Sequence, residues 1–399
     1  MVDRAVEPGD NRVERTAFAL RLLADDLTGA LDTSAQFAVH CGALPVGWDD
    51  PSAACDRDSR VIDTGCRELP PGEARSCFAE LIDVLAPAAD RLALLKLDSL
   101  LRGHAGDEIA DCADRWPERS IVVAPAFPAQ QRITRRGRQH WFDGRQFTAI
   151  GEDLCATLAA RGVAFELRRP GGAIPAGVSI FDAENDADLA MIVAAGRPDG
   201  LEPLWCGSAG LGYALAQQSG PGSRGQAEPV KQPLLGLFGT DHPVTRQQLS
   251  PVSQHVFTVQ PAKPQAATAI ADAMRSRGVA FVTFALPPGV TRAGARHAID
   301  VTMADMLPRL PRPRTLVVSG GETLRAVCGI LGADHLVVDG QIAPGIPSSR
   351  IRAGAWDGVR VISKSGAFGA PDLLHALVES SSTRVSTRVK EQPSCHTSR

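Results

Sequence analysis

Two adjacent carboxylates, Asp25 and Asp26, follow the apolar run Phe18–Ala24 and precede Thr28 and Gly29. Carboxylates in this position could bind hydroxyl groups or a metal ion, and one of them could accept a proton from a substrate hydroxyl. A plainer interpretation is that Asp26 caps a helix while Asp25 is solvated. The residue types alone favour the plainer interpretation.

A denser polar segment follows the apolar run Arg91–Leu97, where Lys96, Asp98, Ser99 and Arg102 lie close together in the sequence. The planar guanidinium of Arg102 can hold a carboxylate or a phosphate through two parallel hydrogen bonds. The same spacing would also allow an internal salt bridge from Asp98 to Arg102 or Lys96. The sequence leaves both interpretations open.

A third apolar run, Ile121–Ala124, leads into a loop whose shape is fixed by Pro125 and Pro128. Arg132 follows this loop and could give a bound anion another contact. The alternative is an ordinary surface loop, because Arg132 belongs to a basic cluster, 132–138, of the kind that usually faces solvent.

Glycine-rich turns follow two apolar runs in the second half of the chain, and a stiff Pro-Gly loop lies between them. Their candidate ligand-binding residues are Gly320, Gly321, Glu322 and Thr323 in the first turn, Lys364, Gly366 and Gly369 in the second, and Gly345 in the loop. Backbone N–H groups at a glycine-rich helix N-terminus can face a phosphate. The chain has no G-x-x-x-x-G-K-[ST], which argues against a P-loop NTPase. It also has no G-x-G-x-x-G after a strand, which weakens a dinucleotide-binding interpretation.

The short apolar runs alternate with segments patterned for amphipathic helices, such as Gly106–Trp116 and Thr323–Leu331. This alternation predicts an α/β protein with mainly parallel sheets flanked by helices. Ligands of such sheets bind at the carboxyl ends of the strands, which is where the polar segments fall.

A stretch rich in Gly, Pro, Ser and Gln, 217–233, predicts a linker between two domains. We therefore expect a first domain over 16–216 and a second over 234–379, each with its own sheet. The polar ends of the chain, 1–15 and 380–399, predict a disordered leader and a disordered tail.

Composition excludes several classes of protein. The 399 residues carry 42 Lys and Arg against 45 Asp and Glu, so no basic field favours a nucleic acid or an anionic membrane. The nine cysteines are widely spaced without C-x-x-C, as is typical of reduced thiols in the cytoplasm rather than of disulfides or zinc sites. The chain begins with no secretory signal and has no long apolar run to span a membrane. We expect a cytoplasmic protein that binds small molecules, and the sequence leaves open whether it forms a homo-oligomer.

The ordered set of motifs is similar to that of the four-carbon acid sugar kinase family, the ATP-dependent kinases of threonate and erythronate. The first half of the chain carries ADDLTGALD at 24–32, KLDSLLRG at 96–103 and APAFPAQQRITRRG at 124–137. The second half carries LFGTDHPVTRQQL at 237–249, SGGETLRAV at 319–327, IAPGIP at 342–347 and SKSGAFGAPDLL at 363–374. Each motif is modest alone, but their order and spacing are specific.

This resemblance implies a sugar-acid-binding first domain and a nucleotide-binding second domain whose closure assembles the site. It implies phosphate transfer from ATP to a four-carbon acid sugar, on the terminal 4-hydroxyl, with Mg²⁺ on the ATP phosphates through ligands that the sequence does not identify. The general base would be Asp26, with Asp98 as its competitor. The sugar-binding residues would be Asp25, Lys96, Ser99, Arg102 and Arg132, with the substrate carboxylate near Arg102. Thr240 would join the glycine-rich residues at the nucleotide.

Three positions depart from the pattern of the family. Leu100 stands where the family usually has Thr, Thr240-Asp241-His242 replaces a Ser-rich turn, and Gln131 stands where Gly usually precedes the arginine. An alternative function is therefore a non-catalytic sensor that binds a sugar acid or nucleotide without transferring phosphate. A nicotinamide-dependent oxidoreductase fits the fold class but lacks the dinucleotide-binding motif.

Overall fold

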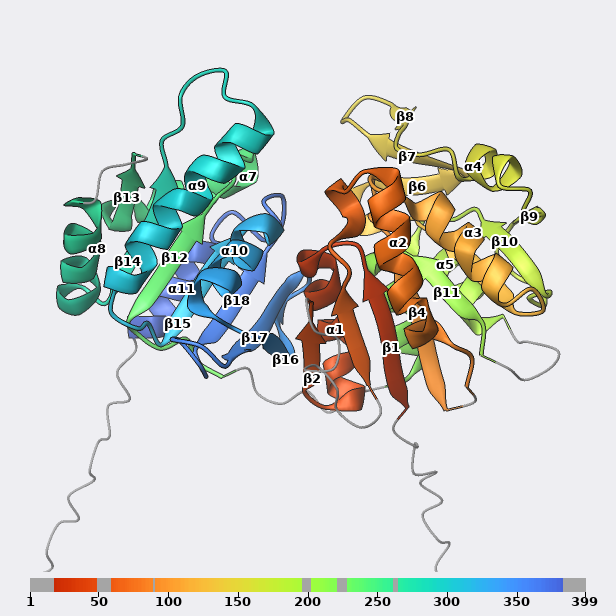
Figure 1. Cartoon of the computed structure of the whole chain (residues 1–399), viewed down its shortest axis with the longest axis horizontal. Helices are drawn as coiled ribbons and strands as arrows, with labels where there is room; N and C mark the ends of the chain where they lie inside the picture. The colour runs from red at the N-terminus through yellow and green to blue at the C-terminus, as the bar shows by residue number, and fades with distance from the viewer. Residues whose placement is uncertain are drawn as a thin grey trace, which may run out of the picture. The chain divides into compact units, whose positions relative to one another are not determined.

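The computed structural model describes residues 18–48, 59–88, 90–195, 202–220, 228–260 and 265–382 (Figure 1). Contacts divide the chain into two compact units. The first unit comprises Met1–Ala227 together with Gly332–Gly358, and the second comprises Glu228–Leu331 and Val359–Arg399. Each unit is built from a sheet and helices, as predicted for an α/β protein.

The main sheet of the first unit has the strand order β17-β16-β2-β3-β1-β4-β11-β5-β10-β9. These strands are β1 (Ala19–Ala24), β2 (Leu44–Gly47), β3 (Arg60–Asp63), β4 (Arg91–Lys96), β5 (Ser120–Ala124), β9 (Phe165–Arg168), β10 (Gly177–Phe181), β11 (Leu204–Gly207), β16 (His335–Ala343) and β17 (Ile346–Arg352). Neighbours from β2 to β9 pair in parallel. The β16–β17 hairpin is antiparallel, and β16 joins β2 in antiparallel register.

Helices cover this sheet. They are α1 (Leu27–Cys41), α2 (Pro71–Leu81), α3 (Ala105–Arg115), α4 (Leu154–Ala160), α5 (Asp186–Ala194) and α6 (Ala209–Gln218). The central strand β1 is buried along its whole length, as expected for a parallel strand covered on both faces. Apolar residues of α3, such as Ile109, pack with Leu95 of β4 and Val123 of β5 in one continuous core.

A small antiparallel sheet of β6 (Arg132–Arg135), β7 (Arg138–Phe142) and β8 (Phe147–Ala149) also belongs to the first unit (Figure 1). Its anchor is Gln139, which is almost fully buried. The Gln139 amide donates hydrogen bonds to the carbonyls of Ser99, at 2.9 Å, and Pro125, at 3.1 Å. The small sheet is thereby fixed to the loops that follow β4 and β5.

The sheet of the second unit has the order β13-β14-β12-β15-β18, and every neighbouring pair is parallel. Its strands are β12 (Leu234–Phe238), β13 (Val256–Val259), β14 (Val279–Phe284), β15 (Thr315–Ser319) and β18 (Arg360–Lys364). Its helices are α7 (Pro243–Leu249), α8 (Gln265–Ser276), α9 (Arg292–Met306), α10 (Gly321–Leu331) and α11 (Leu373–Ser382).

Each sheet contains two neighbouring strands from which the chain continues in opposite directions along the sheet. In the first unit, β1 continues through α1 to β2 on one side, whereas β4 continues through α3 to β5 on the other. In the second unit, β12 continues to β13 on one side, whereas β15 leads on to β18 on the other. Such switch points open a crevice at the carboxyl ends of the two strands, so they are the expected ligand sites of this architecture.

The compact units differ from the expected domains in one segment. We assigned 332–358 to the second domain, but its hairpin groups with the first unit. The reason is that β16 pairs with β2 and contacts α1, where the side chains of Gln36 and Gln341 exchange hydrogen bonds of 2.9 and 3.0 Å.

The expected linker and chain ends fall largely outside the described residues. Helix α6 extends to Gln218, beyond the expected start of the linker, and 221–227 are not described. At the other end α11 continues to Ser382, so the first residues of the expected tail are helical. The rest of that tail and the expected leader, 1–15, lie outside the described residues.

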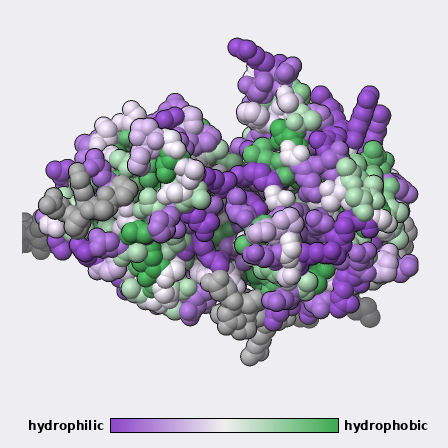
Figure 2. Space-filling view, turned by 45° about the horizontal axis from the view of Figure 1, so that its top comes forward, coloured by the Kyte–Doolittle hydropathy of each residue, from purple (hydrophilic) through white to green (hydrophobic). Residues whose placement is uncertain are grey.

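Within the described ranges, no helix is both long and apolar enough to cross a membrane. On the face shown in Figure 2, hydrophilic residues predominate and hydrophobic residues form separate patches. The cysteines that the structure describes are free thiols, whereas Cys55 and Cys395 lie outside the described residues.

Candidate functional site

The switch point of the first unit brings the predicted acidic residues together. Ala24 of β1 pairs with Lys96 of β4, so Asp25 and Asp26 leave the sheet beside the residues that lead to Asp98. Asp26 also caps α1, because its Oδ1 accepts a hydrogen bond of 2.9 Å from the backbone N–H of Gly29. The helix-capping interpretation is therefore correct for Asp26, but it is not the whole role of this side chain.

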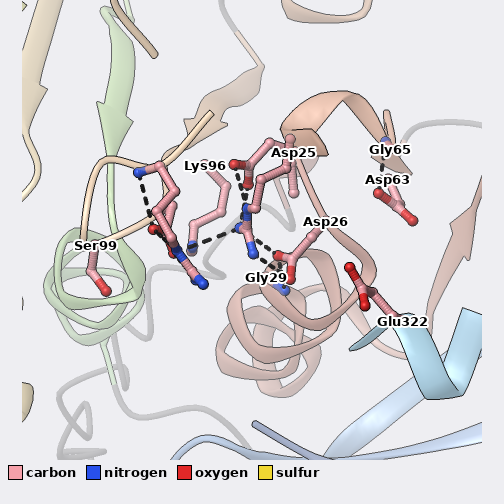
Figure 3. A network of polar contacts seen from close by, with 12 residues as sticks. Asp25, Asp26, Gly29, Asp63, Gly65, Lys96, Ser99 and Glu322 are labelled. Carbon is pink, nitrogen blue, oxygen red and sulfur yellow. Dashed lines mark hydrogen bonds and ion pairs between the residues drawn. The ribbon is translucent and has the colours of Figure 1, made fainter. Parts of the chain in front are cut away.

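Arg67 lies at the centre of these carboxylates. Its Nε and Nη2 donate to the two oxygens of Asp25 at 2.8 and 2.6 Å. Nη2 also donates to Oδ1 of Asp26 at 2.8 Å, and Nη1 lies 2.7 Å from Oδ2 of the same carboxylate. One oxygen of Asp98 lies 3.7 Å from Nη2. Figure 3 shows these contacts converging beside Asp25 and Asp26.

The sequence interpretation missed Arg67. It lies in the 3₁₀ turn Cys66–Glu68, just after β3, which is the parallel neighbour of β1. The signal was the short run Arg60–Asp63 followed by Thr64 and Gly65, a strand end like those that were inspected. A four-residue strand that begins with arginine does not stand out as an apolar run.

Asp98 and Arg102 form the internal salt bridge that the spacing allowed. Nε and Nη2 of Arg102 donate to the two oxygens of Asp98 at 2.7 and 2.9 Å. The Arg102 side chain is about half exposed, whereas Asp98 is buried. The Nε–Nη2 edge of the Arg102 guanidinium is thus occupied by Asp98.

Lys96 is buried beneath the start of α1 and donates a hydrogen bond of 2.8 Å to the carbonyl of Leu97. A Cβ at position 29 would lie 2.7 Å from Oδ1 of Asp26 and 3.2 Å from Nζ of Lys96, so a larger residue there would displace the Asp26 carboxylate. One helical turn further on, Asp32 is buried, and burial raises its pKa to about 6 against the opposing charge of Lys96.

The surroundings shift the acidic groups in different directions. Burial raises the pKa of Asp25, although the Arg67 charge and hydrogen bonds oppose this effect. Burial acts in the same way on Asp98, but hydrogen bonds from Arg102 and the charge of Arg67 outweigh it and hold the pKa of Asp98 below its usual range. Asp98 is therefore a weak base, which counts against it as the proton acceptor.

Ser99 and Arg132, both predicted to bind the sugar acid, contact each other. Nη1 of Arg132 donates to the hydroxyl of Ser99. Gln131, which stands where the family usually has Gly, has a left-handed backbone with φ of 57°. Glycine adopts this conformation without strain, whereas other residues adopt it rarely.

In the second unit, Lys364 has a different environment from the one predicted. Its ammonium is buried and donates to the Thr245 hydroxyl at 2.9 Å, the Ser319 hydroxyl at 3.2 Å and the Gly366 carbonyl at 3.4 Å. No carboxylate pairs with it among the described residues, and burial lowers its pKa to about 8. Lys364 thus connects the ends of β15 and β18 to α7.

The same helix fixes the glycine-rich loop that follows β18. Thr245 donates to the Gly366 carbonyl at 2.8 Å. The amide of Gln248, another residue that the sequence interpretation missed, donates to the carbonyls of Phe368, Gly369 and Ala370 at 3.1, 3.0 and 2.9 Å. These contacts engage the carbonyls of the loop, and the Phe368 N–H donates to the Ser365 carbonyl at 3.1 Å, so the loop has a fixed shape.

The other predicted nucleotide residues cluster at the ends of β12 and β15. Gly320 has φ of 110°, and its N–H donates to the Lys364 carbonyl at 3.0 Å. Thr240 borders Gly366, because a Cβ on that glycine would lie 2.7 Å from its hydroxyl. Gly321 begins α10, and Thr323 is buried in its first turn.

Two predicted nucleotide residues have other surroundings. Glu322 forms exposed ion pairs with Arg292 and Arg296 at 3.2 and 3.8 Å. Gly345 lies in the turn of the β16–β17 hairpin, which belongs to the first unit. The structure therefore groups Thr240, Lys364 and the two glycine-rich turns in the second unit, but not Gly345.

Two family models match the chain. The Sugar-binding N-terminal domain matches residues 20–151, and the Nucleotide-binding C-terminal domain matches residues 235–374. The chain belongs to the four-carbon acid sugar kinase family. The second match includes the β16–β17 hairpin, so the domain boundary of the family differs there from the compact units of the fold.

Curated members of the family resemble most of the chain. A D-threonate kinase of Cupriavidus necator is 29% identical over 88% of this chain and 94% of its own length. A 3-oxo-tetronate kinase of Methylobacterium radiotolerans is 27% identical over 89% of this chain and 97% of its own length. The solved structure of a Haemophilus influenzae protein covers 90% of this chain and 98% of its own, with a TM-score of 0.63 and 20% identity, which supports the fold.

Proposed function

We propose that this protein is an ATP-dependent kinase of a four-carbon acid sugar. The proposal rests on the observation that each segment matched by a family model contains a switch point with groups suited to the ligand of that domain. The sugar-binding match contains the carboxylates and guanidinium groups at the ends of β1, β3 and β4. The nucleotide-binding match contains the glycine-rich turns after β15 and β18.

The acidic cluster suits a polyhydroxylated substrate. Asp25, Asp26 and Asp98 supply acceptors for sugar hydroxyls, and Arg67 keeps them in fixed positions. Fixed acceptors cost little reorganisation when the substrate binds, which favours an oriented hydroxyl. Lys96 would contribute its positive charge to the site without contacting the substrate, because its ammonium is buried.

Asp26 is the proposed general base. Its side chain is a quarter exposed, more than those of Asp25 and Asp98, so a substrate hydroxyl can approach it. In the proposed step the hydroxyl oxygen bonds to the γ-phosphorus of ATP while the bond from that phosphorus to the leaving oxygen of ADP breaks. The hydroxyl proton passes to the Asp26 carboxylate. Transfers of this kind depend mainly on positioning and charge stabilisation.

The turns after β15 and β18 would bind the ATP phosphates through backbone N–H groups. Mg²⁺ would supply the charge that offsets the phosphates during transfer. The described residues include no cluster of three His, Cys, Asp or Glu side chains that could hold a metal. Mg²⁺ would be held through the phosphate oxygens of ATP.

A coupled assay for ADP release tests this function. The full chain with ATP and Mg²⁺ should release ADP in the presence of D-threonate, D-erythronate or 3-oxo-tetronate. It should release far less with threitol, the matching neutral polyol. Binding of both ligands without ADP release would instead favour the non-catalytic sensor, and no response to any aldonate would overturn the proposal.

A further inference from the structure

The guanidinium groups of Arg67, Arg102 and Arg132 lie near the ends of β3, β4 and β5, and the first two are already paired with carboxylates. Arg67 uses Nε, Nη1 and Nη2 on Asp25 and Asp26. Arg102 uses Nε and Nη2 on Asp98. At Arg67 a substrate carboxylate would have to compete with protein carboxylates that are already in place, and at Arg102 it could use only the guanidinium edge that Asp98 leaves free.

Arg132 differs from both. Its Nη1 donates to the Ser99 hydroxyl, and its Nε is buried without a hydrogen-bond partner among the described residues. No carboxylate in the described ranges lies within ion-pair distance of it. Burial lowers the pKa of Arg132, with the charge of Asp98 opposing this, but a guanidinium remains protonated in proteins.

A partly buried guanidinium whose Nε has no partner is unfavourable, and a bound anion would remove that cost. The backbone of Arg132 is also fixed before a ligand binds. The backbone N–H and C=O of Arg132 bond to Phe127 at 3.1 and 2.8 Å. The neighbouring strand is anchored through Gln139 to the Ser99 carbonyl. Little ordering is then needed when a ligand arrives, which favours binding.

We infer that Arg132, rather than Arg102, receives the carboxylate of the acid sugar, with the Ser99 hydroxyl beside it. This assignment rests on the proposed function and adds to it the residue that selects an acid over a neutral sugar. Arg102 then acts as a positioning residue that holds Asp98. The small antiparallel sheet, through β6, thereby carries the specificity for a charged substrate.

The test is calorimetry of D-threonate binding to the full chain, together with steady-state ADP release. Arg132→Gln should weaken D-threonate binding and raise its KM by roughly 10–100-fold, and should leave the KM for ATP unchanged. The preference for D-threonate over threitol should shrink by a similar factor. Arg132→Lys keeps the charge but loses the planar guanidinium, so its D-threonate affinity should lie between those of Arg132→Gln and the wild type. Arg135→Gln is the matched control, because Arg135 lies in the same strand but is exposed and paired with Glu184.

Unchanged D-threonate binding by Arg132→Gln in an active enzyme would overturn this inference and leave the proposed function intact. The same holds if Arg102→Gln, and not Arg132→Gln, abolishes the preference for the acid. If Arg132→Gln does not fold, the D-threonate affinity of Arg132→Lys is measured instead. An Arg132→Lys affinity equal to that of the wild type would contradict the inference. D-threonate binding by the wild type without ADP release would overturn the proposed function alone. Failure of the wild type to bind any aldonate would overturn both.

Discussion

Arg67 donates two hydrogen bonds to Asp25, from Nε at 2.8 Å and from Nη2 at 2.6 Å, and both side chains are largely buried. The two residues come from different strand ends, since Asp25 follows β1 and Arg67 follows β3. This pair therefore connects two neighbouring strands at the edge where the acidic cluster lies. Its loss would leave a buried carboxylate without its cation.

Arg67→Gln should accordingly lower the free energy of unfolding by about 3–5 kcal/mol, the range for breaking one side of a buried ion pair. Arg115→Gln is the control, because Arg115 forms an exposed pair with Asp83 at 3.0 Å and should cost less than about 1 kcal/mol. Chemical denaturation of both variants measures the difference. Equal losses in the two variants would show that Arg67 does not stabilise the strand ends.

Asp26→Asn should lower kcat by about 10²–10⁴-fold, because the amide keeps the shape of the side chain but cannot accept a proton. Asparagine caps helices as well as aspartate does, so α1 should remain intact. Asp153→Asn is the matched control, since Asp153 caps α4 through a hydrogen bond of 3.1 Å and lies outside the acidic cluster. Steady-state kinetics with D-threonate and ATP gives kcat. A near-normal kcat for Asp26→Asn would exclude Asp26 as the base.

Lys364 should make stability depend on pH in alkaline solution. Its pKa is lowered from 10.5 in the unfolded chain to about 8 in the folded protein, because burial disfavours the ammonium. Between these values the unfolded state binds more protons, so stability due to this group should rise with pH, by roughly 3 kcal/mol over the window. Between pH 7 and 10.5, the unfolding free energy of the wild type should rise by this amount relative to that of Lys364→Met. The exposed Lys231→Met is the control, and parallel curves for wild type and Lys364→Met would refute the assignment.

Gly320→Ala should weaken ATP binding about tenfold, or 1.4 kcal/mol. The reason is that φ of 110° at position 320 is strained for alanine, so the turn between β15 and α10 must shift. Gly289→Ala is the control, because Gly289 also has positive φ but a Cβ there would contact nothing within 4 Å. Calorimetry with ATP measures both variants. Equal ATP affinities in the two would remove this turn from the nucleotide site.

The sequence predicted the fold class well because the buried parallel strands are continuous apolar runs, as β1 shows. It also located Asp25, Asp26, Asp98 and Lys364 at strand ends. It could not show how the charges pair, because pairing depends on which strands are neighbours. Arg67 was therefore missed, and the pairing of Arg102 with Asp98 remained one of two open interpretations until the structure showed it. The sequence also did not indicate that the β16–β17 hairpin groups with the first compact unit, because its partner strand, β2, lies far away in the sequence.

Transfer of a phosphoryl group from ATP to a four-carbon acid sugar can be observed by ³¹P NMR of the product. After incubation of the full chain with ATP, Mg²⁺ and D-threonate, we expect a phosphate-ester signal that grows in step with ADP. Its coupling to two protons would place the ester on the terminal carbon, at the 4-hydroxyl. If ATP and D-threonate both bind but only inorganic phosphate or unchanged ATP is found, the account of a sugar-acid kinase is contradicted.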